Sequence, residues 1–149
     1  MAENQPEAAR LRTLPSRLLS MAATHADRTV GDALAARGAR KWHYAVLATL
    51  AEFGPASQAE LSERTHVYRS DLVAVINELT GQGLVERSAD PGDRRRNVIT
   101  MTDEGGRRLR ELDGVLAEAE DVVLAGLSPA DREELTRLLT ALVRHHRHS

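Results

Sequence analysis

Asp90-Pro91-Gly92-Asp93-Arg94-Arg95-Arg96 lies between two short runs with β-strand character, Leu84-Val85-Glu86-Arg87 and Val98-Ile99-Thr100-Met101. Proline fixes one φ angle of a turn, glycine tolerates a positive φ, and aspartate caps local N–H groups. The stretch therefore predicts a β-hairpin with three consecutive arginines at its tip. Such a hairpin suits the minor groove of DNA, which is narrow and electronegative.

Two predicted helices precede this hairpin and are separated by a short turn. Ser57-Gln58-Ala59-Glu60 has the pattern of a capping box, which starts a helix over about 58–64. The apolar residues of the second helix, over about 69–82, follow a helical spacing, and Gly83 ends it. Two helices followed by a hairpin indicate a winged helix-turn-helix, which we assign to residues 39–101.

Further helices are predicted on both sides of this lobe. The apolar spacing indicates one long helix from Leu11 to a stop at Gly38, with Gly31 kinking or dividing it, and a second helix from Arg40 to Phe53. After the hairpin, leucines at steps of three and four predict a helix that Gly126 ends.

The last predicted helix begins at Ser128-Pro129, because serine favours the N-cap and proline the first helical position.

The terminal helices carry more apolar surface than two isolated helices can hide, and a second copy of the chain would bury it. We therefore expect a mostly α fold (an α+β winged helix). Its parts are a flexible terminus at 1–9, the winged lobe, and a helical dimerisation region from 10–38 and 102–146.

The composition is that of a globular protein without a general affinity for nucleic acid. The chain has 149 residues, of which 42% are hydrophobic and 28% charged, and its net charge is −2. DNA binding would therefore depend on local clusters of arginine. The absence of cysteine excludes disulfides and thiolate metal sites.

The sequence offers no pattern for catalysis, a cofactor or a membrane span. It has no glycine-rich phosphate loop, no nucleophile elbow and no pair of metal ligands at helical spacing. His145, His146 and His148 in the polar tail lack the spacing and the acidic partner of a closed metal site. No apolar run approaches the ~20 residues of a membrane span. We expect a cytoplasmic protein that is not an enzyme and that uses neither metal nor cofactor.

The outward face of the helix over 69–82 is the candidate for base recognition, because the second helix of a helix-turn-helix enters the major groove. Its candidate residues are Tyr68, Arg69, Ser70, Asp71, Ala74 and Asn77. Arginine suits guanine, asparagine suits adenine, and aspartate accepts from cytosine. Ser57 and Gln58, at the start of the preceding helix, are candidates for phosphate contacts. Alternatively, the face is only the solvated side of an amphipathic helix, and Ser57 only a cap.

Segments along nearly the whole chain resemble the MarR (multiple antibiotic resistance regulator) family. They are Ala45-Val46-Leu47-Ala48-Thr49-Leu50, Ala59-Glu60-Leu61-Ser62, Arg69-Ser70, Gly83-Leu84-Val85-Glu86-Arg87, Asp90-Pro91-Gly92-Asp93-Arg94-Arg95 and Thr100-Met101-Thr102-Asp103-Glu104-Gly105. The resemblance implies a homodimeric winged-helix transcription factor, usually a repressor, that a small and often aromatic or phenolic ligand releases from DNA.

The resemblance also assigns roles within the hairpin. It implies that Arg95 enters the minor groove, that the carboxylate of Asp93 braces the Arg95 guanidinium, and that Arg94 and Arg96 contact phosphates. Tyr68 and Asp71 flank the Arg-Ser pair where the family often has other residues, so they bear on which operator sequence is bound.

In this architecture the ligand cleft lies between the first two helices and the winged lobe. Arg17, Met21 and His25 share one face of the first helix, and Trp42 and His43 begin the second. Together they would form an aromatic-walled pocket with a cation for a carboxylate or phenolate. Alternatively, Trp42 fills the core and the others are ordinary helix residues.

These observations favour a homodimeric, sequence-specific regulator that binds a pseudo-palindromic operator of double-stranded DNA. Two alternatives stay open. A winged helix can serve as a protein-interaction module without DNA, or the protein can bind DNA constitutively without an effector.

Overall fold

A computed structural model of the chain describes residues 6–147. The described residues up to Thr29 and from Glu118 onward form one compact unit, and Val30–Ala117 form a second. The flexible terminus expected at residues 1–9 lies largely outside the described part, as does His148. No helix within residues 6–147 is long and apolar enough to cross a membrane.

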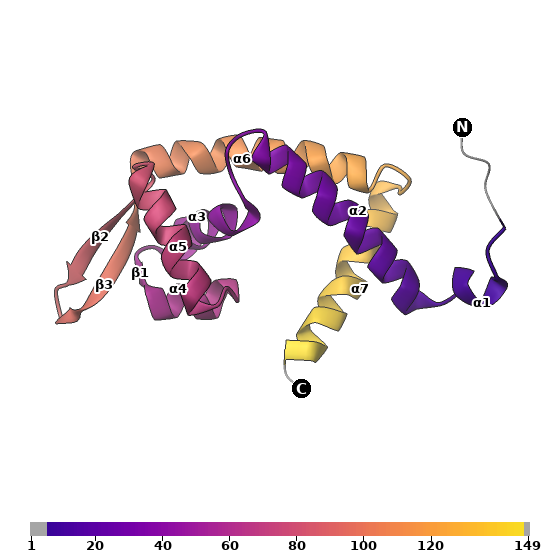
Figure 1. The fold of residues 1–149 in the computed structure, drawn as a ribbon, viewed down its shortest axis with the longest axis horizontal. Helices are drawn as coiled ribbons and strands as arrows, with labels where there is room; N and C mark the ends of the chain where they lie inside the picture. Colours follow the sequence, from indigo (N-terminus) through magenta and orange to yellow (C-terminus); the bar gives the residue numbers. More distant parts are fainter. Residues whose placement is uncertain (1–5, 148–149) are drawn as a thin grey trace. The chain divides into compact units, whose positions relative to one another are not determined.

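Residues 6–147 form ten elements (Figure 1), and most of them are helices. In chain order they are α1 (Ala9–Arg12), α2 (Pro15–Ala35), α3 (Lys41–Phe53), β1 (Ala56–Ser57), α4 (Gln58–Thr65), α5 (Arg69–Gly81), β2 (Val85–Asp90), β3 (Asp93–Met101), α6 (Asp103–Val123) and α7 (Pro129–Arg147). The expected α+β winged helix is therefore confirmed.

The first helix differs from the prediction of one long helix. Proline has no N–H and disfavours helical backbone in the residue before it, so the chain breaks at Thr13 and Leu14 and restarts with Pro15 at the first helical position of α2. Gly31 lies inside α2 without ending it. Gly38, with a φ of 68°, closes the helix as predicted.

The sheet contains one strand that the sequence did not indicate. Its order is β1-β3-β2, all antiparallel, with Ala56 opposite Ile99 and Val85 opposite Met101. With only two residues, β1 is too short to show the alternation by which strands are predicted. It joins the start of α4 to the middle of β3, and so fixes the hairpin against the helix-turn-helix.

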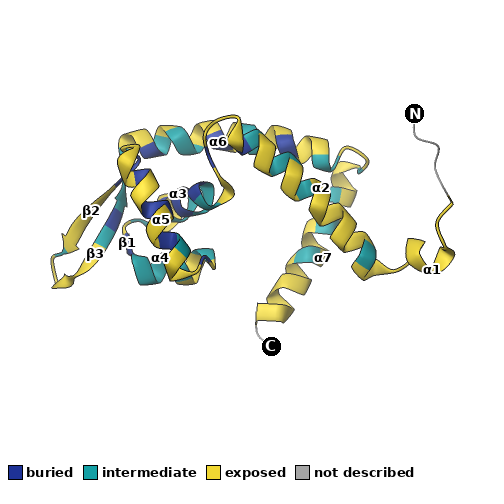
Figure 2. Ribbon diagram, in the orientation of Figure 1, coloured by how far each residue is buried: buried dark blue, intermediate teal, exposed yellow. Residues whose placement is uncertain are grey.

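A leucine- and valine-rich core holds α3, α4, α5 and the sheet together in the unit Val30–Ala117. Its fully buried members include Leu47, Leu61, Ile76 and Ile99. Figure 2 shows buried positions on α3 and α5, whereas the hairpin tip is exposed. A smaller cluster around Leu34 and Leu112 joins the end of α2 to α6.

A polar network ties the start of α3 to α5. The buried His43 ring accepts from the Arg40 backbone N–H at Nδ1 (3.2 Å), and its Nε2 lies 2.6 Å from Glu78 Oε2. The Arg40 guanidinium also donates to both oxygens of Glu78. Hydrogen bonds from His43, first, and from Arg40 hold the pKa of Glu78 below its ordinary value.

This network predicts a stability that depends on pH. Because the folded state lowers the pKa of Glu78, its contribution is present above the ordinary glutamate pKa of about 4.3 and is lost as the pH falls through the lowered folded value. Between pH 6 and pH 3 the free energy of unfolding, measured by urea titration, should fall less in Glu78→Gln than in the wild type.

Glu86→Gln, at an exposed strand position, is the control and should show the same pH dependence as the wild type. Identical curves for wild type and Glu78→Gln would contradict the role of Glu78.

Candidate nucleic-acid interface

The two helices of the helix-turn-helix are joined by a short, hydrogen-bonded turn. Ser57 caps α4, since its hydroxyl accepts from the Glu60 N–H at 3.2 Å, as the capping box predicts. α4 ends at Thr65, and His66 follows as its C-cap with a φ of 59°. The Ser62 hydroxyl donates to the Val67 carbonyl at 2.6 Å, and Val67 is buried. The turn thus fixes where α5 begins.

The outward face of α5 carries most of the predicted recognition residues. Tyr68 is 81% exposed at the N-cap, and Arg69, Ser70, Ala74 and Asn77 are also exposed. Asp71 is half-buried. The opposite side of α5 packs into the core. This orientation leaves the N-terminal half of α5 available to a ligand as large as DNA.

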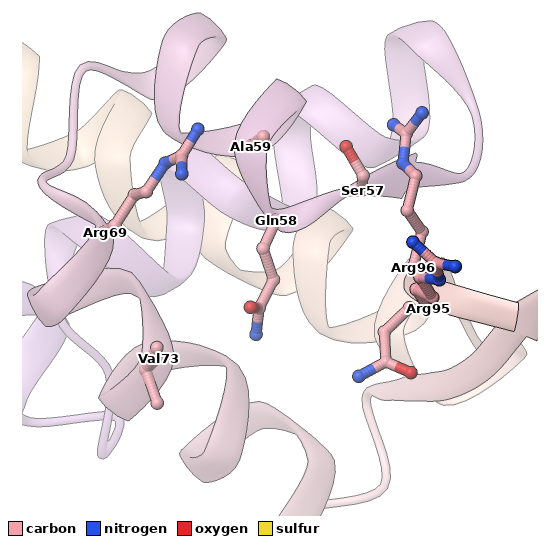
Figure 3. A pocket seen from close by; sticks show the side chains of 8 residues that line it. Ser57, Gln58, Ala59, Arg69, Val73, Arg95 and Arg96 are labelled. Atoms are coloured by element: carbon pink, nitrogen blue, oxygen red, sulfur yellow. The ribbon is translucent and has the colours of Figure 1, made fainter. Parts of the chain in front are cut away.

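A cleft of about 280 Å³ joins α4, α5 and the hairpin. It is lined by Ser57, Gln58, Ala59, Arg69, Val73, Arg95, Arg96 and Asn97. In Figure 3, Gln58 lies between the α5 side chains Arg69 and Val73 and the β3 side chains Arg95 and Arg96. Residues predicted separately on a cap, a helix and a hairpin therefore share one concave surface.

Three lining residues, Ala59, Val73 and Asn97, were not predicted, and seven predicted DNA-binding residues lie outside the cleft. Those seven are Tyr68, Ser70, Asp71, Ala74, Asn77, Asp93 and Arg94. Tyr68 and Ser70 line a second, wider hollow of about 660 Å³ with Arg69 and the turn residue His66. The sequence could have indicated Val73, because this valine is apolar but does not belong to the helical spacing of the residues of α5 that face the core.

The arginines of the interface fall into two electrostatic classes. Arg96 donates to Glu60 Oε1 at 3.0 Å, and the same carboxylate pairs with Arg64. The Ser57 hydroxyl and backbone, then Arg64 and Arg96, hold the pKa of Glu60 below its ordinary value. In contrast, no ion pair within residues 6–147 involves Arg94 or Arg95 of the hairpin.

The hairpin turn differs from its prediction in two details. Gly92 does not have a positive φ, although Asp90 caps the turn as expected, since its carboxylate accepts from the Gly92 N–H at 2.8 Å. The Asp93 carboxylate accepts from the Arg95 backbone N–H at 3.0 Å, where a contact with its guanidinium was expected. Aspartate commonly accepts from the N–H two residues on, so the brace acts on the backbone of Arg95.

Asn77 lies farther along α5 and is held by the hairpin. Its amide oxygen accepts from the guanidinium of Arg87 on β2. The contact fixes the orientation of the Asn77 side chain, which was predicted to contact adenine. It also connects α5 to strand β2 of the hairpin, outside the cleft.

The candidate effector residues are divided between the two units. Arg17, paired with Glu7 at 2.9 Å, belongs to the unit of the chain ends, together with the exposed Met21 and His25. Trp42 is half-buried and packs against the core of the winged unit, and His43 is buried in the network with Glu78. Both ring nitrogens of His43 are thus used within the protein.

Comparisons with known proteins agree with this architecture. Residues 38–96 match the model of the MarR family. The chain is 28% identical over 100 residues to the HTH-type transcriptional repressor NicR of Pseudomonas putida, covering 67% of this chain and 63% of the relative. It is 35% identical over 101 residues to a putative transcriptional regulatory protein for the hcr operon of Thauera aromatica, covering 68% and 61%. The match thus spans less than two thirds of each curated relative.

A solved structure extends the similarity to most of the fold. The PcaV transcriptional regulator from Streptomyces coelicolor, in complex with its natural ligand, superposes with a TM-score of 0.76 at 26% identity. The superposition covers 93% of this chain and 98% of that protein. The capped helix-turn-helix, the Asp-Pro-Gly-Asp-Arg-Arg hairpin and these matches together show that residues 38–96 have the winged region of the MarR family.

Proposed function

We propose that this protein is a homodimeric transcriptional regulator, most simply a repressor, that binds specific DNA sequences. The observation that carries the proposal is the cleft in which Arg69 of α5, Gln58 of α4 and Arg95 of β3 meet. A helix-turn-helix and an arginine-bearing hairpin on one surface can contact a major groove and its neighbouring minor groove together. The similarity to the repressor NicR, 28% identity over 100 residues, supports the same function.

In the proposed complex, each part of the cleft has its own role. The start of α5 reads base edges, with Arg69 suited to guanine. Ser57 and Gln58 at the N-terminus of α4 contact phosphates. Arg95 enters the minor groove, and Arg94 at the tip contacts the backbone. Arg96 is partly neutralised by Glu60, so we assign it the weaker phosphate contact.

Apolar side chains in the unit of the chain ends support the homodimer. Six leucines and one valine of α1, α2, α7 and the break between α1 and α2 are between 42% and 48% exposed: Leu11, Leu14, Leu18, Leu19, Leu138, Leu142 and Val143. A hollow lined by Leu19, Leu139, Leu142 and Val143 adds to this surface. Burying it in a second copy would stabilise a dimer with a twofold axis, which in turn requires a pseudo-palindromic operator.

We further propose that a small aromatic or phenolic effector changes DNA affinity, with Arg17, Met21, His25, Trp42 and His43 as candidate contacts. The support is the PcaV structure, which was solved with its natural ligand. A constitutive binder without effector is the alternative. Cytoplasmic location, the absence of catalysis and independence of cofactors follow from the proposed role.

A protein-interaction module without DNA is the second class of function. Residues 57–101 contain six arginines and seven acidic residues, so the lobe as a whole is not basic. The distribution nevertheless favours DNA, because Arg69 and Arg95 line the cleft while Glu60 faces Arg96 and Arg64.

The proposed function is tested by selecting bound sequences from a pool of random duplex DNA with the full chain. We expect enrichment of a pseudo-palindrome whose half-site centres lie about 34 Å, or one helical turn, apart. Mobility shifts of the selected duplex should show one complex with two chains, whose affinity falls steeply with salt. A scrambled duplex of the same composition is the control. Equal binding to both duplexes would reject sequence-specific recognition.

A further inference from the structure

One apolar side chain interrupts the polar surface of the recognition helix. Val73 is 44% exposed, whereas Val75 and Ile76 on the same helix are fully buried. Val73 lines the cleft together with Arg69, Gln58 and Arg95. It is not among the residues that build the core of this unit. Its exposed methyl groups therefore face the space in which the proposed function places DNA.

Position and chemistry together define what Val73 can contact there. Val73 follows Arg69 by four residues, so the two side chains are neighbours on one face of α5. In the major groove the only apolar group on a base edge is the C5-methyl of thymine. Valine offers neither donor nor acceptor, so it gains from that methyl group and from no other base feature.

Resting on the proposed function, we propose that Val73 is a specificity-determining residue that contacts the C5-methyl of a thymine in each half-site. Four residues of helix advance about 6 Å, which is close to two base steps of B-DNA. The thymine therefore lies about two base pairs from the guanine that Arg69 contacts.

The experiment uses the operator obtained by selection. Thymidines are replaced by deoxyuridine, which lacks only the methyl group, and each variant operator carries the replacement at one pair of symmetry-related positions. Wild-type protein should lose about four-fold in affinity per contacted methyl, equivalent to ~0.8 kcal/mol, at one position in each half-site. Val73→Ala should bind thymine and uracil at that position equally. The variant removes exposed atoms and favours the helix, so its fold is maintained.

Val122→Ala is the matched control, since Val122 is 66% exposed on α6 outside the cleft. It should keep the wild-type response to uracil. If uracil has no effect at any position, or if Val73→Ala keeps the wild-type response, the role of Val73 is rejected while the proposed function stands. If selection yields no enriched sequence, the proposed function itself fails, and this inference fails with it.

Discussion

Replacing Gly105 by alanine is expected to destabilise the winged unit by about 3 kcal/mol or more, at the upper end for overpacking substitutions. A Cβ at this position would collide with the backbone carbonyl oxygen of Leu84 and lie only 2.7 Å from Met101 Cγ. A backbone carbonyl cannot rotate away as the end of a side chain can. α6 must therefore shift, and thermal unfolding should occur about 10 °C lower.

The expected cost is high because the hydrogen bonds around Leu84 oppose such a shift. The Leu84 carbonyl accepts from the Thr102 N–H at 3.0 Å, and the Thr102 hydroxyl donates to the Gly83 carbonyl at 2.7 Å. The Gly105 N–H in turn donates to the Thr102 hydroxyl at 3.1 Å. Moving α6 away from Leu84 would lengthen or break these bonds.

Gly106→Ala is a control that differs by one residue. A Cβ at Gly106 would meet Arg110 Nη1 at 3.7 Å and Met101 Cε at 3.8 Å, which are ordinary contacts. Alanine is the better helix former, so this variant should be more stable than wild type by up to ~1 kcal/mol. Calorimetry of the two variants separates the effects. Similar shifts of both midpoints in the same direction would contradict the close approach at Gly105.

The start of α6 illustrates which parts of the fold the sequence could predict. Local chemistry predicted the Ser57 cap and the glycine stops at Gly38 and Gly83, because a cap or a positive φ depends on nearby residues only. The sequence placed Thr102 to Gly105 at the start of a helix and within a family pattern, but it did not explain the glycine. The reason for a glycine there is the carbonyl of Leu84, which the chain brings close only when the hairpin has formed.

The site shows the same distinction between local and distant contacts. Patterns within one helix or hairpin predicted Arg69 and Arg95, and the structure places both in one cleft. The pair of Arg96 with Glu60 joins residues 36 positions apart, and β1 fixes that arrangement. No spacing rule covers such a pair, so the prediction of a phosphate contact for Arg96 did not include its ion pair with Glu60.

Arg95→Ala is expected to weaken binding to the selected operator ten-fold or more, a loss of at least about 1.4 kcal/mol. The Asp93 carboxylate holds the Arg95 backbone N–H at 3.0 Å, and the hairpin tip is exposed. An arginine so presented gains from the negative potential of a narrow minor groove. Because the rest of the lobe is not basic, few other cations can compensate for its loss.

Arg96→Ala is the matched control in the next residue of the same strand. Glu60 already offsets the charge of Arg96, so this variant should lose less affinity than Arg95→Ala, and its main effect should be on the salt dependence. Mobility shifts at several salt concentrations measure both quantities. Unchanged affinity for Arg95→Ala would remove the wing from the proposed mechanism. Equal losses for both variants would contradict the separate roles of the two arginines, because the ion pair with Glu60 is what distinguishes Arg96 from Arg95.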